Sequence, residues 1–404
     1  MKILTVNCVY EIYSTGKIIK NIAEFLADRD CEFFYCYEFG EKAGASNAFR
    51  ISGRYEYYFY YLWSRMIGLP YGTGYLSTMR LIRKMKKVSP DIVHIHCPNA
   101  NAVNLYWLLN YLKRKQIPTI ITNHAEYFYT GNCAHAFECR GYLNGCKECK
   151  EYKLQTSSWF FNRTGYAWKR MKKAFDGFER LMMVAVSPWQ EQRIRTSSIA
   201  KECETVVVKN GIDTENIFYY RKNVGLDIKS TGEKILLHVT AHFSDNPDDP
   251  KGGRYVIKLA EALPDIRIIV VGPYDLELKQ VPANMELAGA VGDPSVLAQY
   301  YSAADLLVMA SRRETYGLTC AESLSCGTPV VGFKNGGTET IALPEYSCFV
   351  DYGDVDALAD TVKLWIERKE SICRELEQKA KEVYSNRNMA MEYYKLYNQV
   401  LEKR

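Results

Sequence analysis

The chain has 404 residues, which is too long for one ordinary domain and predicts two. Hydrophobic residues make up 47% and charged residues 25%, a composition typical of soluble globular proteins, and no stretch reaches the roughly 18–20 apolar residues of a membrane span. The net charge of +5 is uneven, because residues 1–210 carry 30 Lys and Arg against 18 Asp and Glu (+12), and residues 211–404 carry 22 against 29 (−7). A basic N-terminal half predicts an anionic partner such as membrane lipid, a diphosphate-linked acceptor or nucleic acid.

The first half of the chain alternates strand and helix signals. Strands are predicted at residues 2–8, 31–37, 92–96, 119–123, 181–186 and 205–208. Helices are predicted at 17–29, 76–88, 101–115 and 160–178, and another begins at Pro188 behind a Ser187 N-cap. A turn is expected at 14–16, and the first strand has no signal-peptide cleavage site after it. This alternation predicts a parallel sheet with right-handed crossovers.

The second half repeats the pattern after a turn at 210–213. Its predicted strands are 235–240, 267–271, 305–310, 329–333 and 348–350, its helices are 254–263, 294–303, 318–325 and 355–366, and the tail 371–402 is predicted to be helical throughout. The fold class is therefore α/β, with two doubly wound domains. We predict an N-terminal domain at 1–208, a C-terminal domain at 209–385, and a C-terminal helix at 386–404 that packs back on the first domain. Ligands of such folds bind outside the carboxyl ends of the strands.

The segment 311–341 carries the most informative motif. A strand ends before a short loop, and Gly317 then precedes a helix whose first N–H groups suit an anion such as a diphosphate. Glu314 lies on the loop and Glu322 lies one turn into the helix, where carboxylates can accept hydrogen bonds from sugar and ribose hydroxyls. The alternative from spacing alone is a capped helix with solvated glutamates.

The pattern Glu314-x₇-Glu322, with Tyr316-Gly317-Leu318 after the first glutamate, resembles the donor-site signature of the retaining family 4 glycosyltransferases, which have the GT-B fold. The likeness continues in order along most of the chain. It takes in residues 90–94, the strand before His124, residues 210–213, Lys251-Gly252 and residues 326–329. Residues 14–17 and the cysteines of residues 124–149 are similar to bacterial capsular, exopolysaccharide and colanic-acid-type members in particular.

The resemblance implies two Rossmann-like domains that face each other across a cleft, and it implies roles for single residues. Lys251 would bind the donor diphosphate, Glu314 would hold the sugar ring, and Glu322 would accept from the ribose. The donor-binding set would also include Gly16, Tyr316, Gly317, Leu318 and Val291, the last near the base. His124 would face the transferred sugar, which makes His124 and Glu314 the candidate catalytic residues. A surface lysine and a strand-end histidine are the alternatives for Lys251 and His124.

Two departures from the family pattern weaken the predicted phosphate site. The family has an arginine after the first C-domain strand, but here the strand ends in Ala241-His242, so His242 or Arg254 would have to compensate. The family Gly-Gly-x-Pro-Glu loop is one residue short, and Glu339 is matched to its glutamate.

The implied function is retaining transfer of a sugar from a UDP- or GDP-type donor to a growing glycan or lipid-linked acceptor in cell-surface polysaccharide biosynthesis. No Asp-x-Asp lies where a metal-dependent transferase would hold Mg²⁺, so a metal-independent enzyme with no catalytic cofactor is expected. The alternatives are a nucleotide-sugar epimerase, a nucleic-acid-binding protein and a catalytically inactive scaffold. The intact Glu314, Glu322 and Lys251 speak against the scaffold, and no nucleic-acid-binding motif is found.

A cysteine cluster and an aromatic segment remain. Residues 125–160 are predicted to form an irregular insertion with four cysteines, Cys133, Cys139, Cys146 and Cys149. Three alternatives are open for these cysteines: a structural zinc site, free thiols or a disulfide.

Residues 50–75 are dense in aromatics and are followed by a basic helix. This combination suits a peripheral contact with the inner membrane surface, or it reflects partly buried aromatics. The expected location is cytoplasmic.

Overall fold

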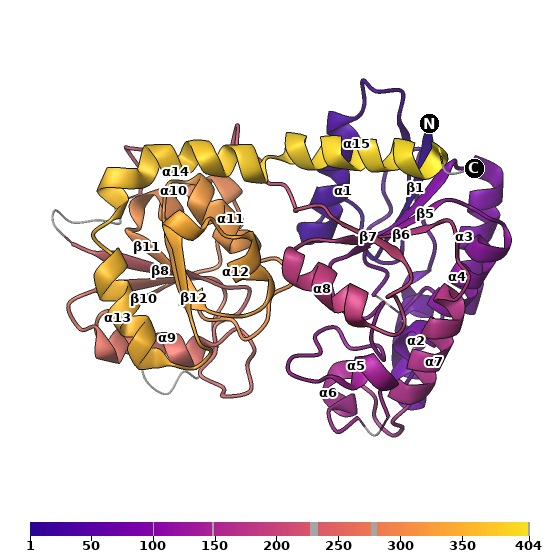
Figure 1. Ribbon diagram of the computed structural model, residues 1–404, viewed down its shortest axis with the longest axis horizontal. Helices are drawn as coiled ribbons and strands as arrows, with labels where there is room; N and C mark the ends of the chain where they lie inside the picture. Colours follow the sequence, from indigo (N-terminus) through magenta and orange to yellow (C-terminus); the bar gives the residue numbers. More distant parts are fainter. Residues whose placement is uncertain (100, 148, 227–232, 276–280, 403–404) are drawn as a thin grey trace. The chain divides into compact units, whose positions relative to one another are not determined.

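The computed structural model describes residues 1–99, 101–147, 149–226, 233–275 and 281–402 (Figure 1). Contacts between residues divide the chain into two compact units, Met1–Val208 with Met389–Arg404, and Lys209–Asn388. Each unit is built on one sheet of parallel strands with helices packed against it. The chain therefore enters the second unit once and returns to the first for its last helix.

The N-terminal unit holds a seven-stranded sheet in the order β3-β2-β1-β4-β5-β6-β7, and all neighbouring strands are parallel. The strands are β1 (Lys2–Asn7), β2 (Glu32–Tyr37), β3 (Ala48–Arg50), β4 (Ile92–Ile95), β5 (Thr119–Asn123), β6 (Leu181–Ala185) and β7 (Glu204–Val207). Every residue of β4, β5 and β6 is buried, as expected for parallel strands covered on both faces.

The helices of this unit are α1 (Tyr13–Phe25), α2 (Arg54–Ile67), α3 (Tyr75–Val88), α4 (Leu105–Arg114), α5 (Gly141–Asn144), α6 (Tyr152–Thr156), α7 (Thr164–Phe175), α8 (Pro188–Thr196) and α15 (Asn386–Glu402), with a 3₁₀ turn at Pro70–Gly72. Successive strand residues point to opposite faces. Ile92 and Ile120 pack with α1 and α15, whereas Val93 and Ile121 pack with α3, α4 and α7. The last helix therefore completes one of the two apolar layers.

The C-terminal unit holds a six-stranded parallel sheet in the order β10-β9-β8-β11-β12-β13. Its strands are β8 (Ile235–Val239), β9 (Arg267–Val271), β10 (Met285–Gly289), β11 (Leu306–Met309), β12 (Val330–Phe333) and β13 (Ser347–Val350). Its helices are α9 (Gly253–Ala262), α10 (Pro294–Ala303), α11 (Leu318–Ser325), α12 (Gly337–Ile341), α13 (Val355–Trp365) and α14 (Lys369–Tyr384), with a 3₁₀ turn at Pro344–Tyr346. Short strands followed by amphipathic helices give the doubly wound pattern.

The segments by which the chain enters and leaves the C-terminal unit lie side by side. Ile212 forms a parallel bridge with Ser385. The Ile212 N–H donates to the Tyr384 carbonyl at 2.8 Å. The Asn386 N–H donates to the Ile212 carbonyl at 2.9 Å. A Cβ at Gly211 would lie 2.7 Å from Asn386 Cα, so this close approach requires glycine.

Two sequence-based predictions of secondary structure are wrong. The turn expected at 14–16 belongs to α1, and a Cβ on Gly16 would lie only 3.0 Å from the Glu11 nitrogen, so this glycine serves close packing rather than a turn. The tail is not one helix, because Ser385 adopts an extended conformation (φ −68°, ψ 142°) between α14 and α15. Strand β10 and helix α2 were not predicted.

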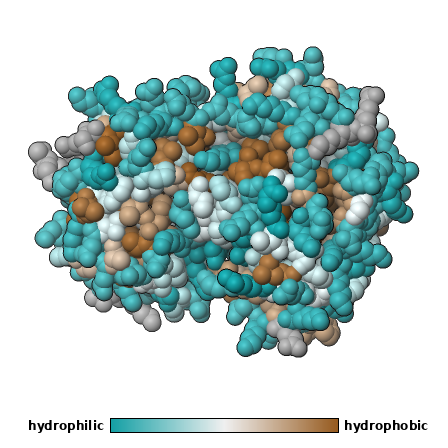
Figure 2. All heavy atoms as spheres, in the orientation of Figure 1, coloured by the Kyte–Doolittle hydropathy of each residue, from teal (hydrophilic) through white to brown (hydrophobic). Residues whose placement is uncertain are grey.

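Within the described ranges, no helix is long and apolar enough to cross a bilayer. On the face displayed in Figure 2, hydrophobic residues form separate small groups among hydrophilic ones.

Candidate donor site

The strand order of the C-terminal unit reverses between its two central strands, β8 and β11. In doubly wound folds the loops at the carboxyl ends of the strands diverge at such a switch point, and ligands bind there. Lys251 follows β8, and Glu314 follows β11. The two candidate residues therefore come from the loops on either side of the switch point.

Lys251 and Glu314 form an ion pair in which Lys251 Nζ lies 2.8 Å from Glu314 Oε1. Both side chains are partly exposed, at 35% and 21%, so an incoming ligand can reach them. The loop of Lys251 depends on Gly252, which adopts φ 76° and whose Cβ would lie 2.1 Å from the Ala310 carbonyl oxygen. Only glycine fits this position without strain.

The loop of Glu314 is held through its backbone. The Glu314 N–H donates to the Asn335 carbonyl at 3.1 Å, and the Glu314 carbonyl accepts from the Gly337 N–H at 2.8 Å. Glu339 in turn accepts from the N–H groups of Asn335 and Gly336 at 3.0 and 2.9 Å, so its carboxylate caps the start of α12. In this structure Glu339 supports the loop that positions Glu314.

Helix α11 begins directly after this loop. Gly317 is its N-cap with φ 88°, and a Cβ there would lie 2.4 Å from Thr338 Oγ1. Leu318 is the first helical residue, so its N–H belongs to the orphan donors of a helix N-terminus, where the dipole favours an anion. The Tyr316 side chain is buried, and its hydroxyl donates to the Asn210 carbonyl at 2.7 Å. Tyr316 therefore anchors the loop and offers only its backbone to a ligand.

Glu322 lies on the second turn of α11 and accepts a hydrogen bond of 2.8 Å from the hydroxyl of Tyr301. Tyr301 is fully buried on α10, so its ring is fixed and its hydroxyl orients the carboxylate. Val291 follows β10 and is half-buried. Strand β9 separates β10 from β8, so Val291 comes from a loop two strands away from that of Lys251.

The two residues expected to replace the family arginine have other partners in this structure. His242 Nε2 lies 2.8 Å from Asp275 Oδ1. A hydrogen bond from Ser244 and the contact with His242 lower the pKa of Asp275. Arg254 donates to the hydroxyl of Tyr255 at 2.8 Å, and its guanidinium lies 4.6 Å from the centre of that ring.

In the N-terminal unit, the strand order reverses between β1 and β4. Gly16 is buried in the helix that follows β1. His124 directly follows β5, and its Nε2 lies 3.1 Å from His96 Nδ1 with the two rings stacked at 5.4 Å. Burial lowers the pKa of His124 to about 4, so the ring is neutral at neutral pH.

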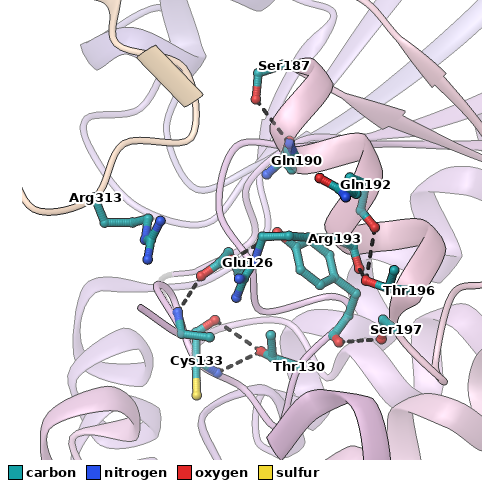
Figure 3. Close-up of polar contacts among 12 residues, drawn as sticks. Glu126, Thr130, Cys133, Ser187, Gln190, Gln192, Arg193, Thr196, Ser197 and Arg313 are labelled. Carbon is teal, nitrogen blue, oxygen red and sulfur yellow. Dashed lines mark hydrogen bonds and ion pairs between the residues drawn. The ribbon is translucent and has the colours of Figure 1, made fainter. Parts of the chain in front are cut away.

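The segment after β5 is fastened to α8 by a buried ion pair. Arg193 Nε lies 2.5 Å from Glu126 Oε1, which also accepts from the Tyr129 hydroxyl at 3.3 Å. Figure 3 shows Glu126 and Arg193 pointing toward each other above the loop of Thr130 and Cys133. The Cys133 N–H donates to Thr130 Oγ1 at 3.0 Å, which closes that loop.

The four cysteines of the insertion are free thiols, and there is no disulfide among them. In the part of the chain that the structure describes, no three His, Cys, Asp or Glu side chains are grouped as in a metal site. Cys133 and Cys146 pack with Ala136 and Tyr142 in a small apolar core, and burial raises the pKa of Cys146 to about 12. Cys139 is exposed, and Cys149 is half-buried. The insertion therefore contains a small apolar core of its own, to which two of its four cysteines belong.

Two family models match the chain. The model described as glycosyltransferase family 4 matches residues 15–216, which is half of the 404 residues. The chain belongs to glycosyltransferase family 4. The model described as glycosyl transferases group 1 matches residues 246–368, a range that contains Lys251, Glu314 and Glu322. The two models therefore match both halves of the chain, and both describe glycosyltransferase sequences.

Known relatives support this assignment. Alpha-monoglucosyldiacylglycerol synthase of Streptococcus pneumoniae is 31% identical over 156 residues, which cover 36% of this chain and 34% of that protein. The putative colanic acid biosynthesis glycosyl transferase WcaC of Escherichia coli is 23% identical over 322 residues, which cover 77% of each chain. The chain spans about a third of the length of the Streptococcus pneumoniae relative that it matches.

The fold agrees with that of solved structures. Anabaena Alr3699/HepE in complex with UDP has a TM-score of 0.65 at 15% identity, over 99% of this chain and 100% of that one. The same protein in complex with UDP-glucose gives a TM-score of 0.62. The two parallel sheets form the GT-B fold, as the sequence predicted, with two Rossmann-like domains.

Sequence reasoning missed the residues that hold the site residues in place. Tyr301 orients Glu322, Asn335 holds Glu314, and His96 contacts His124. Each lies 21 to 28 residues from its partner in sequence, so no local motif joins them. One pattern in the sequence pointed to the contact between His96 and His124. His94 and His96 end one predicted strand, and His124 follows the next predicted strand along the chain.

Proposed function

We propose that this glycosyltransferase is a retaining enzyme that moves a sugar from a UDP- or GDP-type donor to a growing glycan or lipid-linked acceptor in cell-surface polysaccharide biosynthesis. The observation that carries the proposal is the ion pair between Lys251 and Glu314 at the switch point. Glu314 lies three residues before Gly317, the N-cap of α11. A cation, a carboxylate and a helix N-terminus together suit a diphosphate joined to a sugar.

The diphosphate is proposed to bind the N–H groups of Gly317 and Leu318, with Lys251 as its counter-charge. Phosphate oxygens would compete with Glu314 for the ammonium of Lys251. Glu314 would then be released to accept hydrogen bonds from the hydroxyls of the donor sugar. These positive groups stabilise the leaving diphosphate, so we expect transfer to proceed in the presence of EDTA.

Glu322 is proposed to bind the ribose of the donor. A carboxylate can accept from both hydroxyls of a ribose, and the hydrogen bond from Tyr301 fixes its orientation. Val291, half-buried after β10, is proposed to contact the base. Gly16 is proposed to let the backbone of the N-terminal domain approach the donor.

His124 is proposed to hydrogen-bond to the transferred sugar. Its lowered pKa keeps the ring neutral, so one ring nitrogen can donate and the other can accept. In the proposed step the bond from the anomeric carbon to the diphosphate breaks, and a bond to the acceptor oxygen forms on the same face. The proton of the acceptor hydroxyl passes to the leaving phosphate oxygen.

The names of relatives support parts of this proposal. HepE was determined with UDP and with UDP-glucose, which favours a UDP-type donor. WcaC is a putative colanic acid transferase, which favours polysaccharide synthesis. The name of the alpha-monoglucosyldiacylglycerol synthase gives a glucosylated lipid as the product, which supports an acceptor at a membrane surface.

Helix α2 supports peripheral contact with a membrane. Its exposed large hydrophobic residues recur at the spacing of one helical face: Tyr55, Tyr58, Phe59, Leu62, Trp63 and Met66. The exposed Trp159 lies beside the end of this helix, because its backbone N–H donates to the Arg65 carbonyl at 2.9 Å. A hydrophobic stripe that faces solvent can insert into the interface of a lipid bilayer. The stripe lies on the N-terminal unit, whose sequence is basic, and a basic protein surface is attracted to anionic lipids.

A cavity of about 320 Å³ beside the start of α2 is proposed to hold the acceptor head group. It lies where β2 and β3 end, and its lining includes Phe39, Arg50, Tyr57 and Tyr58. The rings of Phe39 and Tyr57 lie 4.8 Å apart, and aromatic faces of this kind pack against sugar rings. Tyr58 also belongs to the exposed stripe of α2, which would bring a lipid-linked head group to the cavity.

The test is donor turnover by the purified protein. UDP-, GDP-, ADP- and dTDP-sugars are offered with and without membrane lipid extract, and release of nucleoside diphosphate is followed for wild type and Glu314→Ala. Release from one donor that depends on Glu314, with a product whose anomeric configuration matches that of the donor, supports the proposal. Conversion of a nucleotide sugar without acceptor would favour an epimerase, and no release or binding of any donor would favour an inactive scaffold.

A further inference from the structure

Three histidines of the N-terminal unit lie along one face of its sheet. His94 is in β4, His96 follows two residues later, and His124 follows β5. Residues two apart share a face of a strand, so His94 and His96 point the same way as Ile92. That is the face covered by α15, which contributes Tyr393 and Tyr397.

The C-terminal helix is hydrogen-bonded to this face. The hydroxyl of Tyr397 lies 2.9 Å from His94 Nδ1, and Thr122 Oγ1 lies 2.8 Å from His94 Nε2. The Tyr393 hydroxyl lies 2.9 Å from the same Thr122 oxygen. Both nitrogens of His94 are thus engaged, one of them by Tyr397, which lies 303 residues away in sequence.

His94 fixes His96 in turn, and His96 contacts His124. The ring centroids of His94 and His96 lie 3.9 Å apart, and His96 is fully buried. His96 Nδ1 lies 3.1 Å from His124 Nε2. Among the described residues, His96 Nε2 has no hydrogen-bond partner.

This geometry selects one tautomer. One of the two facing nitrogens must carry the hydrogen and the other must accept it. If His124 donated, a neutral His96 would carry its own hydrogen on Nε2, as a buried N–H without a partner. A bare acceptor in that place is less costly than an orphaned donor. The hydrogen therefore belongs on His96 Nδ1.

We propose that His96 is a positioning residue for the transfer reaction, which donates from Nδ1 to His124 Nε2 and so fixes His124 as the tautomer with its hydrogen on Nδ1. The proposal rests on the proposed role of His124 at the transferred sugar. Through His94 the same contacts couple His124 to the last helix of the chain.

The tautomer is measured directly by long-range ¹H–¹⁵N spectra of the full chain labelled with ¹⁵N-histidine. The chain has six histidines, so single variants assign the signals. In wild type we expect the Nδ1–H form for His124. His96→Phe keeps a ring against His94 but removes the donor, and His124 should then change its tautomer distribution. His96→Asn places an amide N–H at the same number of bonds from the backbone and should restore the Nδ1–H form.

Activity gives the second measurement. We expect His96→Phe to lower kcat about 10- to 100-fold with little change in KM for the donor, and His96→Asn to recover most of the loss. Tyr397→Phe removes only the hydroxyl contact with His94 and should give a smaller loss in the same direction.

An Nδ1–H signal of His124 that persists in His96→Phe, or an equal loss of kcat in the Phe and Asn variants, would overturn the proposal. If His96→Phe does not fold, the wild-type spectrum decides alone, because an Nε2–H form of His124 contradicts the assignment. If wild type turns over no donor, the proposed function fails, while the spectra still test the tautomer.

Discussion

Lys251 Nζ lies 2.8 Å from Glu314 Oε1, so the cation proposed for the diphosphate and the carboxylate proposed for the sugar are paired in this structure. Lys251→Ala should weaken UDP or GDP binding about 10- to 100-fold, because a hydrogen bond to a charged group contributes about 1.5–3 kcal/mol. Isothermal titration measures the change. Lys258→Ala, an exposed lysine on the following helix, is the matched control and should bind as wild type does. Equal binding by both variants would remove Lys251 from the site.

Gly252 has a stricter steric requirement than its backbone angle alone implies. Gly252 and Gly289 have nearly the same φ, 76° and 75°, but a Cβ would lie 2.1 Å from the Ala310 carbonyl oxygen at Gly252 and would meet nothing within 4 Å at Gly289. Gly289→Ala should therefore cost about 1–2 kcal/mol for the left-handed conformation alone. Gly252→Ala should cost more and should also weaken donor binding. Denaturant unfolding of both variants checks this, and equal losses of stability would contradict the steric argument.

The Glu126–Arg193 pair is buried, with exposed side-chain fractions of 0% and 14%. Arg193→Met should lower the free energy of unfolding by about 3–5 kcal/mol, because it leaves a buried carboxylate without its cation. Lys20→Met removes an exposed lysine 3.8 Å from Glu11 and Glu24, and should cost less than about 1 kcal/mol. If thermal unfolding shows the two variants to be equally stable, the buried pair does not hold the insertion in place.

The exposed stripe of α2 predicts a membrane effect without a stability effect. Phe59→Ser with Trp63→Ser should reduce binding to anionic phospholipid vesicles about tenfold or more, because each exposed aromatic contributes up to roughly 1.5–3 kcal/mol when buried. Co-sedimentation with vesicles measures the binding. Leu364→Ser, at a residue 73% exposed on α13, serves as the control. Retained vesicle binding by the double variant would count against the proposed membrane contact.

Buried histidines predict loss of stability in mild acid. Burial lowers the pKa of His94 to about 3, that of His124 to about 4 and that of His238 to about 4, and it lowers the pKa of His96 well below the usual value. The unfolded chain binds protons below about pH 6.5, whereas the folded chain does not. Stability should therefore be full above that pH and should fall by up to about 1.4 kcal/mol per pH unit for each histidine between about pH 6.5 and 4. Denaturant unfolding at pH 7, 6 and 5 gives the slope, and a constant free energy of unfolding would show that these groups titrate normally.

Much of the fold could be predicted, because its central elements have strong local signals. The bounds of β5, β9, α10 and α11 agree with those predicted from buried apolar runs and from capping residues. Helix α2 was not predicted. Its hydrophobic residues recur at helical spacing, but they face solvent, so this spacing does not mark a face that packs on the core. Strand β10 lies at a sheet edge, and only its first residue is fully buried. The periodic burial that marks a strand is weak there.

The candidate site was predictable where its residues form a local motif. Glu314, Gly317 and Glu322 lie within nine residues, and a strand–loop–helix pattern is enough to place them. The partners of these residues come from other elements, as Tyr301 does for Glu322 and Lys251 does for Glu314. For the four cysteines, the spacing is visible in the sequence, but the apolar packing around Cys133 and Cys146 is not.

The bridge between Ile212 and Ser385 has a consequence for how the two units are joined. The outgoing and returning segments pair with each other, so both covalent connections pass through one place. Ile212 and Ser385 both belong to the second unit, so the bridge ties the start of that unit to its end. A single proteolytic cut in either segment would leave the units linked by the other, so the two halves of a nicked chain should purify as one particle.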